Sequence, residues 1–135
     1  MFRNLTPHDV CIYLPDGTVL TVPREEVEAP RVPLATRQVG RVITPSPAGG
    51  VCLVPVRHSA PAGPPVPLPD PELGVLYIVS RATAEAAPER ADLLYPDDAV
   101  RDERGRIVGC RALGTAVADW EGAITRLWLA AAGID

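Results

Sequence analysis

The sequence predicts a single α+β domain over residues 1–135, with a mostly antiparallel β-sheet and two helices. Three observations support this prediction. Residues 10–22 are apolar and β-rich on either side of an Asp-Gly turn, which is typical of a hairpin. Residues 75–79 form a continuous apolar run that suits a central strand covered on both faces. Residues 115–132 carry an apolar stripe at helical spacing.

The middle of the chain predicts a second hairpin and then a loop. A short strand is expected within residues 37–43, and an apolar strand is expected at residues 51–56. The Pro- and Gly-rich residues 45–50 would form the turn between them. Pro55 cannot donate to a β-ladder, so its strand is expected at an edge or a bulge. Residues 59–71 are dominated by proline and predict an extended surface loop.

A short helix is predicted directly after the central strand. Ser80 can cap a helix near residues 81–87, which Pro88 ends. Residues 93–95 then predict a short strand. A crossover this short is near the minimum for parallel strands, so the direction of the second strand stays open.

The last third predicts a strand and a longer helix. A turn at residues 102–105 leads into a strand at 106–113, and an amphipathic helix is expected near 116–132. Its apolar stripe consists of Val117, Trp120, Ile124, Leu127, Trp128 and Ala131. The stripe either covers the sheet or contacts a partner, which makes Trp120 and Trp128 candidates for a homo-oligomer contact. Packing within the chain is the favoured interpretation, because a small sheet needs such a cover.

Charge and composition restrict the classes of partner. The net charge is −4, which argues against general nucleic-acid binding. No run approaches the roughly 20 apolar residues of a membrane span, and the first residues lack the apolar stretch of a signal peptide. A cytoplasmic location is therefore expected. Every basic residue apart from histidine is arginine, which is typical of GC-rich bacterial or phage genomes.

The cysteines predict small buried side chains and no metal site. Cys11, Cys52 and Cys110 are far apart in apolar runs. A zinc site that combines them with His8 and His58 is the less favoured alternative, because the paired ligand spacings of structural zinc are missing. We expect neither a metal nor a cofactor.

Six residues are candidates for binding a small anionic ligand: Thr6, His8, Ser80, Arg81, Arg101 and Arg111. A helix that begins after Ser80 offers free N–H groups, and guanidinium groups can bind phosphate or carboxylate with two hydrogen bonds. His8 can hydrogen-bond a ligand with help from Thr6.

Structural interpretations of the same residues are favoured. Thr6 and His8 lie in a segment of ordinary turn-forming residues, and Ser80 can be a helix cap with an exposed Arg81 beside it. Arg101 and Arg111 can belong to an ion-pair network with Arg90, Asp92 and Asp102.

Two blocks of the sequence resemble a family of small proteins encoded in bacteriophages, prophages and actinobacterial genomes. Residues 4–10, NLTPHDV, resemble the NLTPHxV opening of that family. YIVSR at residues 77–81, RADLL at 90–94 and VRDERGRIVGCR at 100–111 resemble its C-terminal half. The resemblance implies a phage-related context and no particular activity.

Two functional hypotheses follow. The first is a non-enzymatic, phage-related protein that holds a small anionic or nucleotide-like ligand. The second is a structural or assembly protein, such as a virion accessory, that associates through the tryptophan stripe or a sheet edge. An enzyme is the least supported class, because no glycine elbow surrounds Ser80 and the cysteines lie in apolar runs. We therefore predict no catalytic residue.

Overall fold

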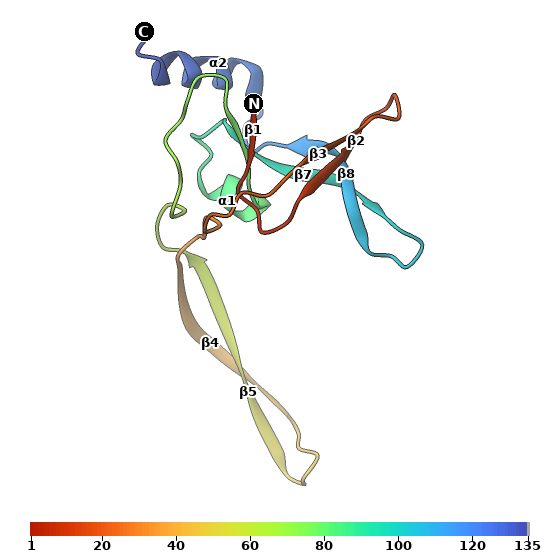
Figure 1. The fold of residues 1–135 in the computed structure, drawn as a ribbon. Helices are drawn as coiled ribbons and strands as arrows, with labels where there is room; N and C mark the ends of the chain where they lie inside the picture. The colour runs from red at the N-terminus through yellow and green to blue at the C-terminus, as the bar shows by residue number, and fades with distance from the viewer. Residues whose placement is uncertain (135) are drawn as a thin grey trace.

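Eight strands and two helices form within residues 1–134, the part of the chain that the computed structural model describes (Figure 1). In chain order they are β1 (Phe2–Asn4), β2 (Val10–Tyr13), β3 (Val19–Val22), β4 (Leu34–Pro45), β5 (Val51–Pro61), β6 (Leu76–Ile78), α1 (Arg81–Ala86), β7 (Leu93–Arg101), β8 (Ile107–Gly114) and α2 (Trp120–Ala131). Strands β4 and β5 form a long hairpin that projects from the rest of the molecule. We call this hairpin the arm and the remainder the body.

The α+β class is confirmed, and antiparallel pairing dominates it. The body sheet has the order β1-β6-β7-β8-β2-β3. Strand β7 pairs antiparallel with β8, and β2 pairs antiparallel with β3, whereas β1/β6, β6/β7 and β8/β2 are short parallel pairs. The arm adds the longest antiparallel ladder. Strand β7, which follows β6 and α1 in the chain, therefore pairs parallel with β6, and the sequence had left the direction of this strand open.

Both helices form near their predicted positions. The hydroxyl of Ser80 accepts a hydrogen bond from the amide of Thr83 at 3.2 Å, which caps α1 as the sequence predicts. Helix α2 begins later than predicted, at Trp120. The hydroxyl of Thr115 accepts from the amide of Val117 at 3.0 Å, and this local turn holds the preceding residues outside the helix.

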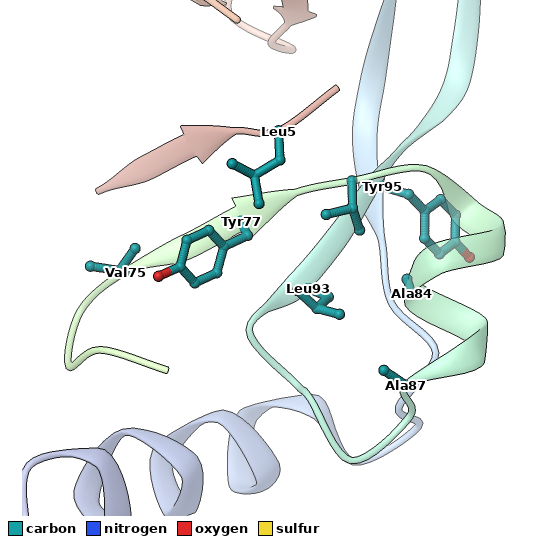
Figure 2. Close-up of a cluster of buried hydrophobic side chains, with 8 residues drawn as sticks. Leu5, Val75, Tyr77, Ala84, Ala87, Leu93 and Tyr95 are labelled. Carbon is teal, nitrogen blue, oxygen red and sulfur yellow. The ribbon is translucent and has the colours of Figure 1, made fainter. Parts of the chain in front are cut away.

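The two faces of the sheet carry separate apolar clusters. Figure 2 shows the first, in which Leu93 and Tyr95 project toward α1, whereas the Tyr77 ring projects away from α1, toward Val75. The second lies on the opposite face and joins β6 to β2, β3 and β8. Its buried members are Val10, Ile12, Val22, Ile78 and Cys110. The alternation of buried side chains along β6 and β7 follows directly from the period of two in a strand, and it covers both faces of these two strands.

The body sheet curls until its two edges meet. Asn4 at the end of β1 forms a parallel bridge with Arg24, which follows β3, and the amide of Glu25 donates to the carbonyl of Asn4 at 2.9 Å. The guanidinium of Arg3 binds the Glu25 carboxylate at 2.8 and 3.0 Å and lies 5.4 Å from the centre of the Tyr77 ring. This contact covers the otherwise open backbone edges of β1 and β3.

The Arg3–Glu25 contact predicts a pH-dependent contribution to stability. Hydrogen bonding to Arg3 lowers the pKa of Glu25 below its usual value. The unfolded chain therefore takes up a proton at a higher pH than the folded chain, and stability falls as the pH drops through about 4. Both side chains are about 30% exposed, so the effect stays below about 1 kcal/mol.

Urea unfolding of the wild type and of Glu25→Gln at pH 7, 5, 4 and 3 tests this contribution. The wild type should be the more stable at pH 7, and the difference should shrink at pH 3. A difference that stays constant over this range would contradict the assignment.

The proline-rich segment is anchored over the body, and its boundaries differ from those predicted. Residues 59–61 of the predicted loop 59–71 belong to β5. Leu68 then packs on the first apolar cluster, the carbonyl of Asp70 accepts from the Tyr77 hydroxyl at 3.1 Å, and that of Pro69 accepts from Arg90 at 2.7 Å. The prolines leave few amides to satisfy, so carbonyl contacts suffice to fix the segment.

Helix α2 packs within the chain. Its two indole N–H groups donate to backbone carbonyls of the body, Trp120 to Ala91 at 2.8 Å and Trp128 to Val75 at 3.2 Å. Ile124 between them is buried. Neither helix within residues 1–134 combines the length and apolar character that crossing a membrane requires.

Candidate functional site

Two of the six predicted ligand-binding residues line a common groove. Thr6 and His8 lie at one wall of a cavity of about 390 Å³ that is lined by residues of β2 and β8. The remaining lining consists of Asp9, Val10, Cys11, Pro96, Ile107, Val108, Gly109 and Cys110. The hydroxyl of Thr6 is already engaged with the side-chain oxygen of Asn4 at 2.6 Å and the carbonyl of His8 at 2.8 Å.

Ser80 and Arg81 lie outside this lining and make local contacts. The hydroxyl of Ser80 lies 2.8 Å from that of Thr83, inside the cap of α1. Arg81 pairs with Glu85 one turn later at 2.8 Å, and its guanidinium lies 5.4 Å from the centre of the Tyr95 ring. Both residues thus match the structural interpretation of a capped short helix.

Arg101 and Arg111 also lie outside the groove lining. Arg101 donates to the carbonyl of Gly105 at 2.7 Å within the β7–β8 turn. Arg111 pairs with Asp98 across the two strands at 3.4 Å, and both side chains are exposed. The predicted network is therefore a series of separate local pairs.

The buried member of that series is the pair between Arg90 and Asp92. Two hydrogen bonds of 2.9 and 2.8 Å join the guanidinium to the carboxylate. The Asp92 side chain is 0% exposed and that of Arg90 is 13% exposed. This pair lies at the start of β7 and also holds the proline-rich segment through Pro69, so its role is structural.

The groove is largely apolar and offers little chemistry for an anion. Within the described residues its lining has no arginine, and its charged member is Asp9, whose carboxylate accepts from the amide of Arg24 at 2.9 Å. Burial raises the pKa of the Cys110 thiol, which disfavours a thiolate nucleophile there. Among residues 1–134, no three metal-binding side chains gather into a site.

The arm is the most unusual surface of the molecule. Its strands contain 12 and 11 residues, which corresponds to a ribbon about 40 Å long. It leaves the body at the bridge between Arg31 and Val66 and extends away from it (Figure 1). The sequence predicts this hairpin but not its length, because residues 34–36 and 59–61 lack the apolar run that signals a strand.

Large aliphatic side chains are exposed on both faces of the arm. Directly paired residues share a face and successive pairs alternate. The pair Val42/Val54 therefore lies on one face and the pair Ile43/Leu53 on the other. The exposed members are Leu34, Val39, Val42, Ile43, Val51, Leu53, Val54 and Val56, each between 41% and 69% exposed.

The arm and the segments on either side of it form the basic part of the protein. Residues 29–69 contain Arg31, Arg37, Arg41 and Arg57 and no aspartate or glutamate. The rest of the chain holds the other nine arginines and all 17 acids, for a formal charge of −8. Within residues 1–134 all six ion pairs lie in the body. Sequence reasoning missed this site, although a 41-residue stretch without an acid is a visible signal.

Comparison with models of protein families, with curated proteins and with solved structures found no match to this chain.

Proposed function

We propose that this chain is a non-enzymatic structural or assembly protein of the cytoplasm that associates with a macromolecular partner through its arm. The single observation behind this proposal is the exposure of eight large aliphatic side chains on a projecting two-stranded ribbon. Soluble monomers rarely expose contiguous apolar patches larger than a few hundred Å². An isolated two-stranded ribbon is also only marginally stable in water. Burial against a partner would remove the apolar side chains from water and would stabilise the two-stranded ribbon.

The anionic-ligand hypothesis receives less support. Ser80, Arg81, Arg101 and Arg111 engage in local contacts, and none of them lines the groove beside Thr6 and His8. An assembly role also agrees with the resemblance to phage and prophage proteins.

A shortened arm tests the proposal. Replacing residues 38–57 by Asn-Gly joins the paired residues Arg37 and His58 through a two-residue hairpin turn. We expect the tagged wild type, expressed in the cells to which it is native, to elute from a size-exclusion column in a large complex. The shortened variant should elute at the size of the free chain. Elution of both proteins as free chains would refute an assembly role for the arm.

A far-ultraviolet circular dichroism melt provides the control. The arm makes its principal contacts within itself, so the shortened variant should retain the melting transition of the body. Loss of that transition would mean that the arm supports the fold of the body. In that case the size-exclusion experiment is repeated with the double variant Val42→Ser/Ile43→Ser, which changes only the tip of the arm.

A further inference from the structure

We infer that the partner of the arm is the body of a second copy of this chain, with the β2–β3 hairpin and the β2/β8 groove as the acceptor surface. This inference rests on the proposed function, because it names the partner of the same arm. Four observations support it: the division of charge, the position of exposed apolar side chains on the body, the direction of the arm, and the character of its tip.

The charges of arm and body are complementary. Arg37, Arg41 and Arg57 have no ion-pair partner among residues 1–134. Residues 9–23, which contain the β2–β3 hairpin, carry Asp9 and Asp16 and no basic residue, whereas the turn before β8 adds Arg104 and Arg106, of which Arg106 pairs with Asp102. An arm that lies along this hairpin of a second copy would pair opposite charges. Two arms side by side would instead bring arginines together without an acid, which disfavours an arm-to-arm contact.

Exposed apolar side chains of the body gather on the same strands. Val19 and Leu20, which lie on opposite faces of β3, are 48% and 40% exposed. On β8, Ile107 and Val108 are 62% and 40% exposed. Strand β2 lies between them in the sheet, and the groove of about 390 Å³ opens beside it.

The arm cannot use this surface within its own chain. Figure 1 shows its tip far below the body, on the side away from the β2–β3 hairpin. The contact therefore joins two molecules, and it is heterologous because the arm and the acceptor are different surfaces. Heterologous contacts repeat from copy to copy and generate rings or filaments.

Nucleic acid fits the arm less well than a second copy does. Beyond Arg41 and Arg57 the tip, residues 42–56, has no charged side chain. Phosphate recognition relies on basic side chains along the contact, and the formal charge of −8 on the rest of the chain would repel the duplex.

Complementation between two variants tests the inference. The first is the shortened arm described above, which keeps the acceptor surface. The second carries Val19→Arg and Ile107→Arg, both at exposed positions, and keeps the arm. By sedimentation velocity we expect the purified wild type to form concentration-dependent oligomers. Each variant alone should bind itself at least about tenfold more weakly, and their mixture should form a one-to-one dimer and nothing larger.

The remaining outcomes would overturn the inference. If the wild type stays monomeric up to about 100 μM, self-association is ruled out, because a dissociation constant above that concentration is far weaker than that of a typical specific contact. Oligomers of the Val19→Arg/Ile107→Arg variant equal to those of the wild type would indicate an arm-to-arm contact. Binding of a 30-base-pair duplex that depends on the arm, with no oligomer, would indicate nucleic acid.

A control variant carries Leu73→Arg and Leu129→Arg at other exposed positions of the body and should assemble as the wild type does. The inference and the proposed function fail in different experiments. A purified monomer combined with a large arm-dependent complex in cells refutes the second copy as partner and retains the assembly role.

Discussion

Replacement of Arg90 by alanine is expected to lower the free energy of unfolding by about 3–5 kcal/mol, because it leaves the Asp92 carboxylate buried without its partner. Asp92 is 0% exposed, and both its carboxylate oxygens accept from the guanidinium. The same substitution removes the hydrogen bond to the Pro69 carbonyl and frees the proline-rich segment over the first apolar cluster. Urea unfolding at pH 7 measures the loss through the shift in midpoint.

Two controls separate this effect from the loss of any ion pair. Arg111→Ala removes a pair whose side chains are more than half exposed, and its cost should stay below about 1 kcal/mol. The double replacement Arg90→Met with Asp92→Leu removes both charges and should recover most of the stability lost in Arg90→Ala. If Arg90→Ala costs no more than Arg111→Ala, the burial assigned to this pair is wrong.

Local patterns in the sequence predict several elements of the body, although the short strand expected at residues 93–95 continues through Pro96 to Arg101 and β1 was not predicted. The Asp-Gly turn at residues 16–17, the Ser80 cap and the apolar run at 75–79 each act over a few neighbours, and each forms as predicted. These predictions succeed because turn geometry, capping and side-chain alternation depend on residues adjacent in sequence. Of the predicted ion-pair network only the pair of Arg90 and Asp92 forms; Arg101 donates to the Gly105 carbonyl, and Arg111 and Asp102 pair with Asp98 and Arg106.

The contacts between distant segments could not be predicted in this way. The parallel pairing of β1 with β6 joins residues more than 70 positions apart, and the closure of Asn4 on Arg24 depends on the curl of the whole sheet. The length of the arm was missed for another reason. Polar pairs such as Thr36/Ser59 continue the ladder without an apolar run, because both faces of an extended ribbon are exposed.

The candidate site is the arm and not the predicted arginines, because an arginine forms an ion pair only where a carboxylate lies near it in space. The guanidinium groups of Arg81 and Arg111 find carboxylates four residues away or across a strand. Those of Arg37, Arg41 and Arg57 lie on a segment without acids. Counting acids within each segment, and not over the whole chain, would have separated the two groups.

Replacement of Asn4 is expected to have the second large effect on stability, because its amide joins three segments inside the body. The nitrogen donates to the carbonyls of His8 at 2.8 Å and Val22 at 2.9 Å. The oxygen accepts from the amide of Thr6 at 3.0 Å and from its hydroxyl. Asn4 is fully buried, so the groups that it leaves unpaired cost about 1–3 kcal/mol each.

We expect Asn4→Leu to lose about 2–4 kcal/mol, since it keeps the volume and removes every hydrogen bond of the amide. Asn4→Asp should lose at least as much at pH 7, because a buried carboxylate would face two carbonyl oxygens. Protonation of the new carboxyl relieves part of this cost, so the deficit of Asn4→Asp should be smaller at pH 4 than at pH 7. The deficit of Asn4→Leu should change little over the same range.

His8→Ala provides the matched control within the same turn. The imidazole is exposed, and the network uses only the backbone carbonyl of His8, so this variant should lie within about 0.5 kcal/mol of the wild type. A large loss in His8→Ala with a small loss in Asn4→Leu would contradict the assignment, because it would give the imidazole and not the Asn4 amide the structural role. The expected order instead makes the NLTPH segment a turn that ties β1 to β3 through the buried side chain of Asn4, with the acceptor surface beginning directly after it.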